Sequence, residues 1–147
     1  MAKIIFNPQR CIGCRACEGA CKQENDLPVG VRWRVVTSNL SGEYPNLKRE
    51  YKSLACRHCL KPKCAEKCPV GAITKDIATG IVEVNTEICT GCMVCVEACP
   101  FGLMCYDAQK NKAGKCTLCK HRLEKGMIPA CVHVCMGLAM KYEAIFN

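Results

Sequence analysis

Sixteen of the 17 cysteines in this chain fall into four groups of four, and cysteine thiolate binds soft metals such as iron and zinc. The groups are Cys11, Cys14, Cys17 and Cys21; Cys56, Cys59, Cys64 and Cys68; Cys89, Cys92, Cys95 and Cys99; and Cys116, Cys119, Cys131 and Cys135. All of these are candidate metal ligands. No acid–base pair, nucleophile–base pair or phosphate-binding glycine loop accompanies them. The pattern predicts metal binding without a catalytic site.

The first and third groups share the spacing C-x2-C-x2-C-x3-C, and the residues leading into them, "IIFNPQRC" and "VEVNTEIC", are also alike. Three thiolates at i, i+3 and i+6 on a tight loop can bind three corners of an iron–sulfur cubane, while the fourth cysteine binds a different cluster. Gly13 and Gly91 lie inside the first C-x2-C, where a missing side chain lets backbone N–H groups approach the sulfurs. The repeat predicts a duplicated architecture around [4Fe–4S] clusters.

The fourth group is unusual because the eleven residues "KHRLEKGMIPA" separate its second cysteine from its third. Thr117 can cap a short helix that ends at Lys125, with Gly126 as its C-terminal stop. About six helical residues travel ~9 Å outward, and four extended residues can return ~13 Å. Cys131 can then rejoin the first two cysteines of its group. The outward helix is either a solvated face or a contact for a partner.

Disulfides and zinc are the other common uses of so many cysteines. Disulfides are disfavoured because the count is odd, many cysteines are three positions apart, and the N-terminal "MAKIIFNPQR" contains no apolar secretory stretch. Four all-cysteine zinc sites in a nucleic-acid-binding module are a remote alternative. No apolar run approaches the ~20 residues that span a bilayer. We therefore expect a cytoplasmic protein without direct membrane insertion.

Short secondary-structure elements are expected around the cysteine groups, which places the chain in the α+β class. Strands are predicted over residues 3–6 and 31–36, and a hairpin over residues 72–75 with 81–85. Short helices are predicted over residues 15–23, 63–67, 93–98 and 118–125. Residues 38–46 are rich in turn-forming residues and are predicted to form a surface loop.

The blocks "KQENDLPVGVRWRVV", "CRHCLKPKCAEKCPVGAI" and "KCTLCKHRLEKGMIPACVHVC" resemble those of the four-cluster iron–sulfur subunits of molybdenum- and tungsten-pterin oxidoreductases, such as formate dehydrogenase and dimethyl sulfoxide reductase. The resemblance covers nearly the whole chain. In size the chain is similar to the small polyferredoxin subunits of tungsten aldehyde oxidoreductases. The family implies one small α+β domain, in which two bacterial-ferredoxin-like modules hold four [4Fe–4S] clusters in a row.

The resemblance also implies how the ligands are shared. The second and third groups are joined by a hairpin and each ends in Cys-Pro, like the halves of a small ferredoxin, so they should exchange fourth ligands in a module of residues 56–104. The first and fourth groups then pair in a module of residues 1–55 and 105–147. The implied sets are Cys56, Cys59, Cys64 and Cys99; Cys68, Cys89, Cys92 and Cys95; Cys11, Cys14, Cys17 and Cys135; and Cys21, Cys116, Cys119 and Cys131. Cys21 and Cys135 lack the following proline, so their exit turns are not defined.

The remaining residues that could bind a metal or take part in electron transfer are interpreted as structural. Cys105 fits none of the four groups and is predicted to be a buried apolar thiol. Each group already has four cysteines, so His58, His121 and His133 are interpreted as structural or as hydrogen-bond partners near the clusters. Trp33 is interpreted as a packing residue.

The formal net charge of +8 would by itself suggest an anionic partner such as nucleic acid. Four oxidised clusters with their thiolates carry about −2 each, roughly −8 in total, so the basic excess is interpreted as compensation and no nucleic-acid partner is expected. The sequence thus predicts an electron-transfer subunit that serves a tungsten- or molybdenum-pterin catalytic subunit and a further redox carrier. A free-standing polyferredoxin for hydrogenase or carbon monoxide dehydrogenase is the nearer alternative. Self-association is left open.

Overall fold

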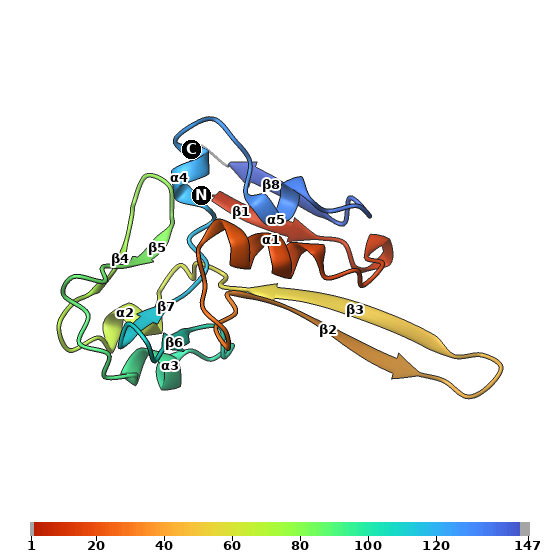
Figure 1. Ribbon diagram of the computed structural model, residues 1–147, viewed down its shortest axis with the longest axis horizontal. Helices are drawn as coiled ribbons and strands as arrows, with labels where there is room; N and C mark the ends of the chain where they lie inside the picture. Colours follow the sequence, from red (N-terminus) through yellow and green to blue (C-terminus); the bar gives the residue numbers. More distant parts are fainter. Residues whose placement is uncertain (1, 145–147) are drawn as a thin grey trace.

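The chain, described here over residues 2–144 by a computed structural model, is drawn in Figure 1. Within these residues the strands form four two-stranded antiparallel sheets, β1–β8, β2–β3, β4–β5 and β6–β7. The strands are β1 (Ala2–Phe6), β2 (Arg34–Ser41), β3 (Lys48–Ala55), β4 (Ile73–Lys75), β5 (Val82–Val84), β6 (Cys105–Asp107), β7 (Lys112–Gly114) and β8 (Met140–Ala144). The helices are η1 (Pro8–Arg10), α1 (Ala16–Glu24), α2 (Lys63–Glu66), α3 (Val94–Ala98), α4 (Lys120–Leu123) and α5 (Ala130–His133). This mixture of short strands and helices confirms the predicted α and β composition.

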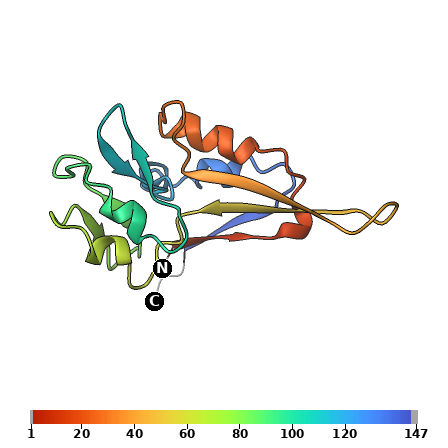
Figure 2. The same cartoon turned by 90° about the horizontal axis from the view of Figure 1, so that it is seen from below.

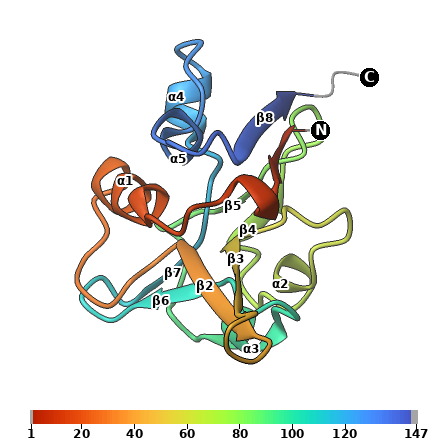
Figure 3. The same ribbon diagram turned by 90° about the vertical axis from the view of Figure 1, so that its right-hand side faces the viewer.

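The two ends of the described chain meet in one sheet, because β1 pairs with β8 in the register Ile4↔Tyr142. Met140 of β8 is buried in an apolar cluster with Val36, Cys17 and Cys131. Helices α1 and α5 are in contact, and α5 also contacts β8. Figure 3 shows α4, α5 and β8 gathered away from α2 and α3. The first and last cysteine groups therefore lie in the same part of the molecule.

The β2–β3 hairpin extends beyond the rest of the molecule, as Figures 1 and 2 show. Its base is packed, since Val36 is buried, whereas residues 37–41 are exposed. The predicted surface loop over residues 38–46 is wrong in part, because pairing continues to Ser41↔Lys48. The polar and turn-forming residues there suggested a loop, but cross-strand hydrogen bonds extend the strand into solvent. The strand expected over residues 31–36 begins instead at Arg34.

A second apolar cluster joins the central cysteine groups. Its buried members are Ala72, Ile73, Val82, Cys89, Cys95, Met104 and Ala113, with Cys64, Cys68 and Cys99 packed against it. Helices α2 and α3 are in contact beside it. Cysteines thus supply part of the core, beside a small number of large apolar side chains. Ala113 brings the β6–β7 hairpin into the same cluster.

The predicted helices over residues 15–23, 63–67 and 93–98 correspond to α1, α2 and α3, and the predicted hairpin corresponds to β4–β5. The helix predicted over residues 118–125 is shorter, because α4 covers Lys120–Leu123. The predicted Thr117 cap is wrong: the residue before α4 is Cys119, in a left-handed conformation without a side-chain cap. The stop at Gly126 is confirmed by its φ of 72° and by its N–H donating to Leu123 O at 2.9 Å.

The return path to Cys131 also differs from the prediction. Pro129 starts a second short helix, α5, and Cys131 lies inside it. The segment between Cys119 and Cys131 therefore contains two short helices joined by a turn, and the residues that lead back to Cys131 are helical and not extended. Strands β6, β7 and β8 were not predicted because three- to five-residue strands carry little sequence pattern. Strand β3 was also missed, because its first residues are exposed and show no apolar alternation.

Candidate metal centres

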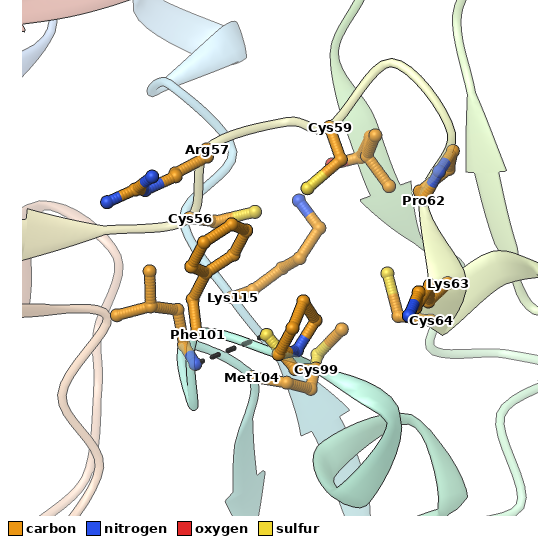
Figure 4. A pocket seen from close by; sticks show the side chains of 13 residues that line it. Cys56, Arg57, Cys59, Pro62, Lys63, Cys64, Cys99, Phe101, Met104 and Lys115 are labelled. Carbon is orange, nitrogen blue, oxygen red and sulfur yellow. Dashed lines mark hydrogen bonds between the residues drawn. The ribbon is translucent and has the colours of Figure 1, made fainter.

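Four cysteines from two segments of the chain surround one cavity, shown in Figure 4. They are Cys56, Cys59, Cys64 and Cys99, here called site C. Three of them come from the loop that leads into α2 and from α2 itself, and Cys99 comes from the residue that ends α3. The other lining residues include Val82, Phe101 and Met104. The cavity therefore combines sulfur donors with a mainly apolar wall.

Two further cavities have the same composition. Site A is lined by Cys11, Cys14, Cys17 and Cys135. Site D is lined by Cys68, Cys89, Cys92 and Cys95. In each case three cysteines of one group meet the last cysteine of another group.

The remaining four cysteines, Cys21, Cys116, Cys119 and Cys131, form site B. Burial raises the pKa of the Cys21 thiol, and the neighbouring Cys116, Cys131 and Cys119 raise it further. The contact between α1 and α5 brings Cys21 to this set. The structure thus gathers the cysteines in the same four sets that the family resemblance implied. That each set ligates a cluster stays a prediction.

The four sites have a defined neighbour order. Cys17 of site A and Cys131 of site B are buried in one apolar cluster. Cys116 of site B is buried in another cluster, against which Cys56 of site C packs. Sites C and D share a third cluster, in which Cys95 of site D is buried and against which Cys99 of site C packs. The order is therefore A, B, C, D.

The first C-x2-C loop of every group has the same backbone shape. The residue just before the second cysteine has a positive φ in all four: Gly13 at 69°, His58 at 48°, Gly91 at 74° and Leu118 at 55°. This conformation turns the backbone toward the sulfur, so that the His58 N–H donates to Cys56 Sγ at 3.5 Å and the Leu118 N–H donates to Cys116 Sγ at 3.4 Å. This approach of an N–H group to sulfur is found at His58 and Leu118, whereas at Gly13 and Gly91 it stays a prediction.

Glycine is required in the other two loops for space as well as for backbone conformation. A Cβ on Gly13 would overlap the Tyr51 ring, and a Cβ on Gly91 would overlap the Asn111 side chain and carbonyl. Asn111 is itself held by the Tyr106 hydroxyl at 2.6 Å. The glycines therefore let β3 and the β6–β7 hairpin cover the loops closely.

The last cysteine of each group accepts a hydrogen bond from the residue four positions later. The backbone N–H groups of Ala72, Leu103 and Ala139 donate to the Sγ atoms of Cys68, Cys99 and Cys135 at 3.3, 3.4 and 3.2 Å. Helix α1 continues past Cys21, so the backbone cannot make this turn. The Asn25 side-chain amide donates to Cys21 Sγ instead, at 3.8 Å. Cys135 makes the usual turn although no proline follows it. The backbone after Cys135 and Cys21, which the sequence did not define, is thus a turn at Cys135 and a continuing helix at Cys21.

Lysines on the hairpins hold the cysteine loops by their carbonyl groups. Lys75 Nζ donates to Cys59 O at 3.0 Å and to Leu60 O at 3.2 Å. Lys112 Nζ donates to Cys89 O. Each interaction joins a hairpin to the loop that it covers.

Two of the three histidines have partners in the structure. His58 Nδ1 accepts from the Val82 N–H at 2.9 Å, and burial together with Lys115 and Lys75 lowers its pKa to about 3. The hydrogen bond from Val82 agrees with a structural role for His58, and the buried Nε2 on the other side of the ring has no hydrogen-bond partner among the described residues. On α4, His121 contacts Glu24 of α1 at 2.8 Å, and Arg122 pairs with the same carboxylate at 2.9 Å. The predicted outward face of this helix is therefore tied to α1.

Cys105 belongs to none of the four sites. Its thiol is half-buried and donates to Arg32 O at 3.0 Å. The prediction of a buried apolar thiol is therefore wrong, because Cys105 stands at the start of β6 beside the polar backbone of residue 32. Trp33 packs its indole ring against Gly114, in agreement with a packing role.

Sequence reasoning missed two residues near the sites. Among the described residues, the buried charged side chains are Arg34 and Lys115. Two other basic residues next to cysteines in the sequence, Arg57 and Lys120, lie at the surface instead. Arg57 stacks on the Phe101 ring at 4.2 Å. Lys120 forms an ion pair with Glu83 at 2.6 Å. The sequence did give one indication that Lys115 lies near a site, because this residue directly precedes Cys116, the first cysteine of the fourth group.

The four sites fit [4Fe–4S] clusters in their donor chemistry. Every donor is a cysteine sulfur, several sulfurs receive N–H groups, and the three cavities have mainly apolar walls. Over residues 2–144, no three His, Cys, Asp or Glu side chains are placed to hold a single metal ion. Within the same residues, no helix has the length and apolar character needed to cross a membrane.

Comparison with family models decides the classification. Residues 47–145 match the model described as a 4Fe-4S dicluster domain. The chain belongs to this 4Fe-4S family. Residues 8–29, which contain the first cysteine group, match a further model described as a 4Fe-4S binding domain. The two matches together include all four cysteine groups.

Curated relatives include protein NrfC and two proteins that are named as parts of reductases. Protein NrfC of Escherichia coli is 38% identical over 141 residues, which are 95% of this chain and 63% of NrfC. A component of the anaerobic dimethyl sulfoxide reductase of Haemophilus influenzae is 39% identical over 151 residues, covering 97% of this chain and 73% of that protein. A component of the selenate reductase of Mesobacillus selenatarsenatis is 33% identical over 169 residues, covering 92% and 58%. These matches confirm the resemblance that the cysteine blocks indicated.

The loop geometry predicts a large difference between two glycine-to-alanine changes. Gly91→Ala should lower the free energy of unfolding by at least ~1 kcal/mol, because alanine is strained at positive φ and its Cβ would displace Asn111. Gly19→Ala is the control: no atom lies within 4 Å of its added Cβ, and alanine favours the helix. Thermal unfolding followed by circular dichroism should show a lower midpoint for Gly91→Ala alone. Equal midpoints would contradict the close packing at Gly91.

The distinction between Cys99 and Cys105 can be measured through iron. Cys99→Ala should lower the iron content by at least about one per chain and alter one cluster signal in electron paramagnetic resonance, because site C loses a sulfur ligand. Cys105→Ala should leave both unchanged, since Cys105 is outside all four sites. Both variants are purified anaerobically beside the parent chain. A loss of iron in Cys105→Ala would show that the assignment of the odd cysteine is wrong.

Proposed function

We propose that this chain is the electron-transfer iron–sulfur subunit of an oxidoreductase complex and that it holds four [4Fe–4S] clusters at sites A to D. The observation that carries the proposal is the exposure of the cysteines along the row. Cys14 of site A and Cys92 of site D are exposed, whereas all four cysteines of site B are buried. A relay needs this combination, because its ends must meet partners while its middle is shielded from solvent.

The proposed ligands follow the four sites as defined. Sites C and D exchange their last cysteines between the second and third groups, and sites A and B exchange theirs between the first and fourth. In each pair, neither site is complete without both segments, so the proposed modules form only when their segments meet. A bound [4Fe–4S] cluster supplies one-electron transfer at a potential set by burial and by hydrogen bonds to sulfur. The chain supplies those hydrogen bonds from residues inside the first C-x2-C loops and from residues that follow the groups.

The formal net charge of the chain is consistent with four bound clusters. Its formal net charge of +8 would balance roughly −8 from four oxidised clusters with their thiolates. A chain that carried one or two clusters would retain a large positive excess. The balance thus supports a count of four, and it makes nucleic acid an unnecessary partner.

The proposed partner is a catalytic subunit with a molybdenum or tungsten pterin. This proposal rests on the relatives, whose names assign them to reductases of dimethyl sulfoxide and selenate. The chain spans about 63% of the length of NrfC, so the partner's substrate is not carried over from any relative. One exposed end of the row would receive electrons from the catalytic subunit or deliver them to it, and the other would serve a further carrier. The alternative is a free-standing polyferredoxin, which would need no catalytic subunit.

Metal analysis tests the number and kind of clusters. The anaerobically purified chain should be brown, contain about sixteen irons with a similar amount of acid-labile sulfide, and bleach on reduction. This result is expected because all four sites offer only cysteine sulfur. A colourless chain with about four zincs would overturn the proposal in favour of the zinc-binding alternative. About eight irons would restrict the proposal to two of the four sites.

Copurification tests the proposed complex. The chain, tagged and isolated anaerobically from its native host, should bring down a large subunit that contains molybdenum or tungsten together with a pterin. The physical reason is that an exposed cluster must lie close to its electron donor or acceptor, which requires a docked complex. Recovery of the loaded chain alone, or with a hydrogenase or carbon monoxide dehydrogenase, would decide for the polyferredoxin alternative.

A further inference from the structure

Two buried cations stand between neighbouring sites of the row. Among the described residues, Arg34 and Lys115 are the buried charged side chains, with relative exposures of 4% and 2%, and no carboxylate is buried with them. A buried charge without a counterion is costly. Each of these side chains therefore needs an anionic group nearby, and the surrounding residues indicate which one.

Arg34 lies between sites A and B. Its Nη1 donates to Ser53 Oγ at 2.8 Å, and Ser53 Oγ lies 3.8 Å from Cys17 Sγ of site A. Two residues along β2, Val36 is buried in one apolar cluster with Cys17 of site A and Cys131 of site B. The guanidinium therefore lies at the junction of the two sites.

One donor of Arg34 has no protein partner. Its Nε is buried and makes no hydrogen bond within the described residues. An unpaired buried N–H is unfavourable, so an acceptor is expected at this point. The sulfur atoms of a bound cluster are acceptors of the required charge.

Lys115 lies between sites B and C. Its side chain lines the site C cavity, and Figure 4 shows its amine directed into the space between Cys56 and Cys59. The same Nζ donates to Cys116 O at 3.0 Å, next to a ligand of site B, and also to Val82 O. An ammonium group has three donors. The third is therefore available toward the site C cavity.

We propose that Arg34 and Lys115 are internal counterions of the row, Arg34 for sites A and B and Lys115 for sites B and C. This inference rests on the proposed function, since it assumes clusters at these sites. A reduced cluster carries one more negative charge than an oxidised one, so a nearby buried cation favours reduction. Site B has both cations beside it and site D has neither. The cations also weaken the repulsion between neighbouring clusters, which lets adjacent sites be reduced together.

The test is a potentiometric titration of the purified holoprotein, followed by electron paramagnetic resonance. Arg34→Gln and Lys115→Gln remove one charge each at similar size. Each variant should shift two of the four reduction steps to more negative potential, with one step shifted in both variants. At a fixed solution potential the ratio of reduced to oxidised cluster at those steps should fall by about tenfold or more. The step that moves in neither variant is assigned to site D.

The controls separate charge from packing. Lys61→Gln removes an exposed charge from the loop between Cys59 and Cys64, and solvent screening should leave all four steps nearly unchanged. Arg34→Lys and Lys115→Arg keep the charge and should restore the parent potentials. If a glutamine variant loses iron, its charge-preserving partner should regain it. Loss of iron in both would assign the residue to packing and overturn the proposal.

The outcomes also separate this inference from the proposed function. A chain with about sixteen irons whose reduction steps do not move in either glutamine variant overturns the counterion role and leaves the electron-transfer proposal standing. Equal shifts of all four steps would likewise overturn it, because the neighbour relations would not hold. A chain that holds zinc overturns the proposed function and this inference together.

Discussion

The burial of many thiol groups in a chain of 147 residues is the constraint on which the rest of the structure depends. A thiolate removed from water needs N–H donors or positive charge nearby, because an uncompensated buried charge is costly. The chain meets this need locally with left-handed loops, such as those at His58 and Leu118, whose N–H groups point at sulfur. Long helices and wide sheets would use those N–H groups internally. The prevalence of very short elements follows from this competition.

The same constraint joins the fold to the sites. Each of the three apolar clusters contains buried cysteines, for example Cys95 in the central one and Cys116 in another. A conventional core would instead rest on large apolar side chains, whereas many of the buried hydrophobic residues described here are cysteine or alanine. The cysteines therefore belong both to the core and to the metal centres. Folding and metal binding are then coupled, since neither the core nor the centres are complete without the other.

The β2–β3 hairpin illustrates how one element serves two parts of the molecule. Its base carries Arg34 and Val36 into the interior near site A, and Ser53 on the opposite strand links Arg34 to Cys17. Its outer half is exposed and leaves the body of the molecule, as Figure 2 shows. The base thus contributes to the environment of the sites, while the outer part adds length without adding core.

Much of the site could be predicted because ligand spacing is a local property. A tight C-x2-C-x2-C loop brings its three sulfurs together wherever it lies, so the first three members of the regular groups follow from local sequence. Turn residues such as Gly126 were also predictable, because left-handed backbone favours glycine. The β6–β7 hairpin and the outer half of β2 were not, since strand pairing depends on a partner that the local pattern does not identify.

The sequence by itself determined the four cysteine groups, the internal repeat and the short elements around them, since these depend on covalent spacing and local conformation. The family resemblance already implied that Cys21 joins Cys131. Only the tertiary structure decided that Asn25 takes the place of a backbone donor at Cys21. It also decided that Arg34 and Lys115 are buried between sites while Arg57 and Lys120 remain at the surface. Basic residues look alike in a sequence. Their effect on a metal centre depends on burial and distance, which are set by the packing of segments far apart in the chain.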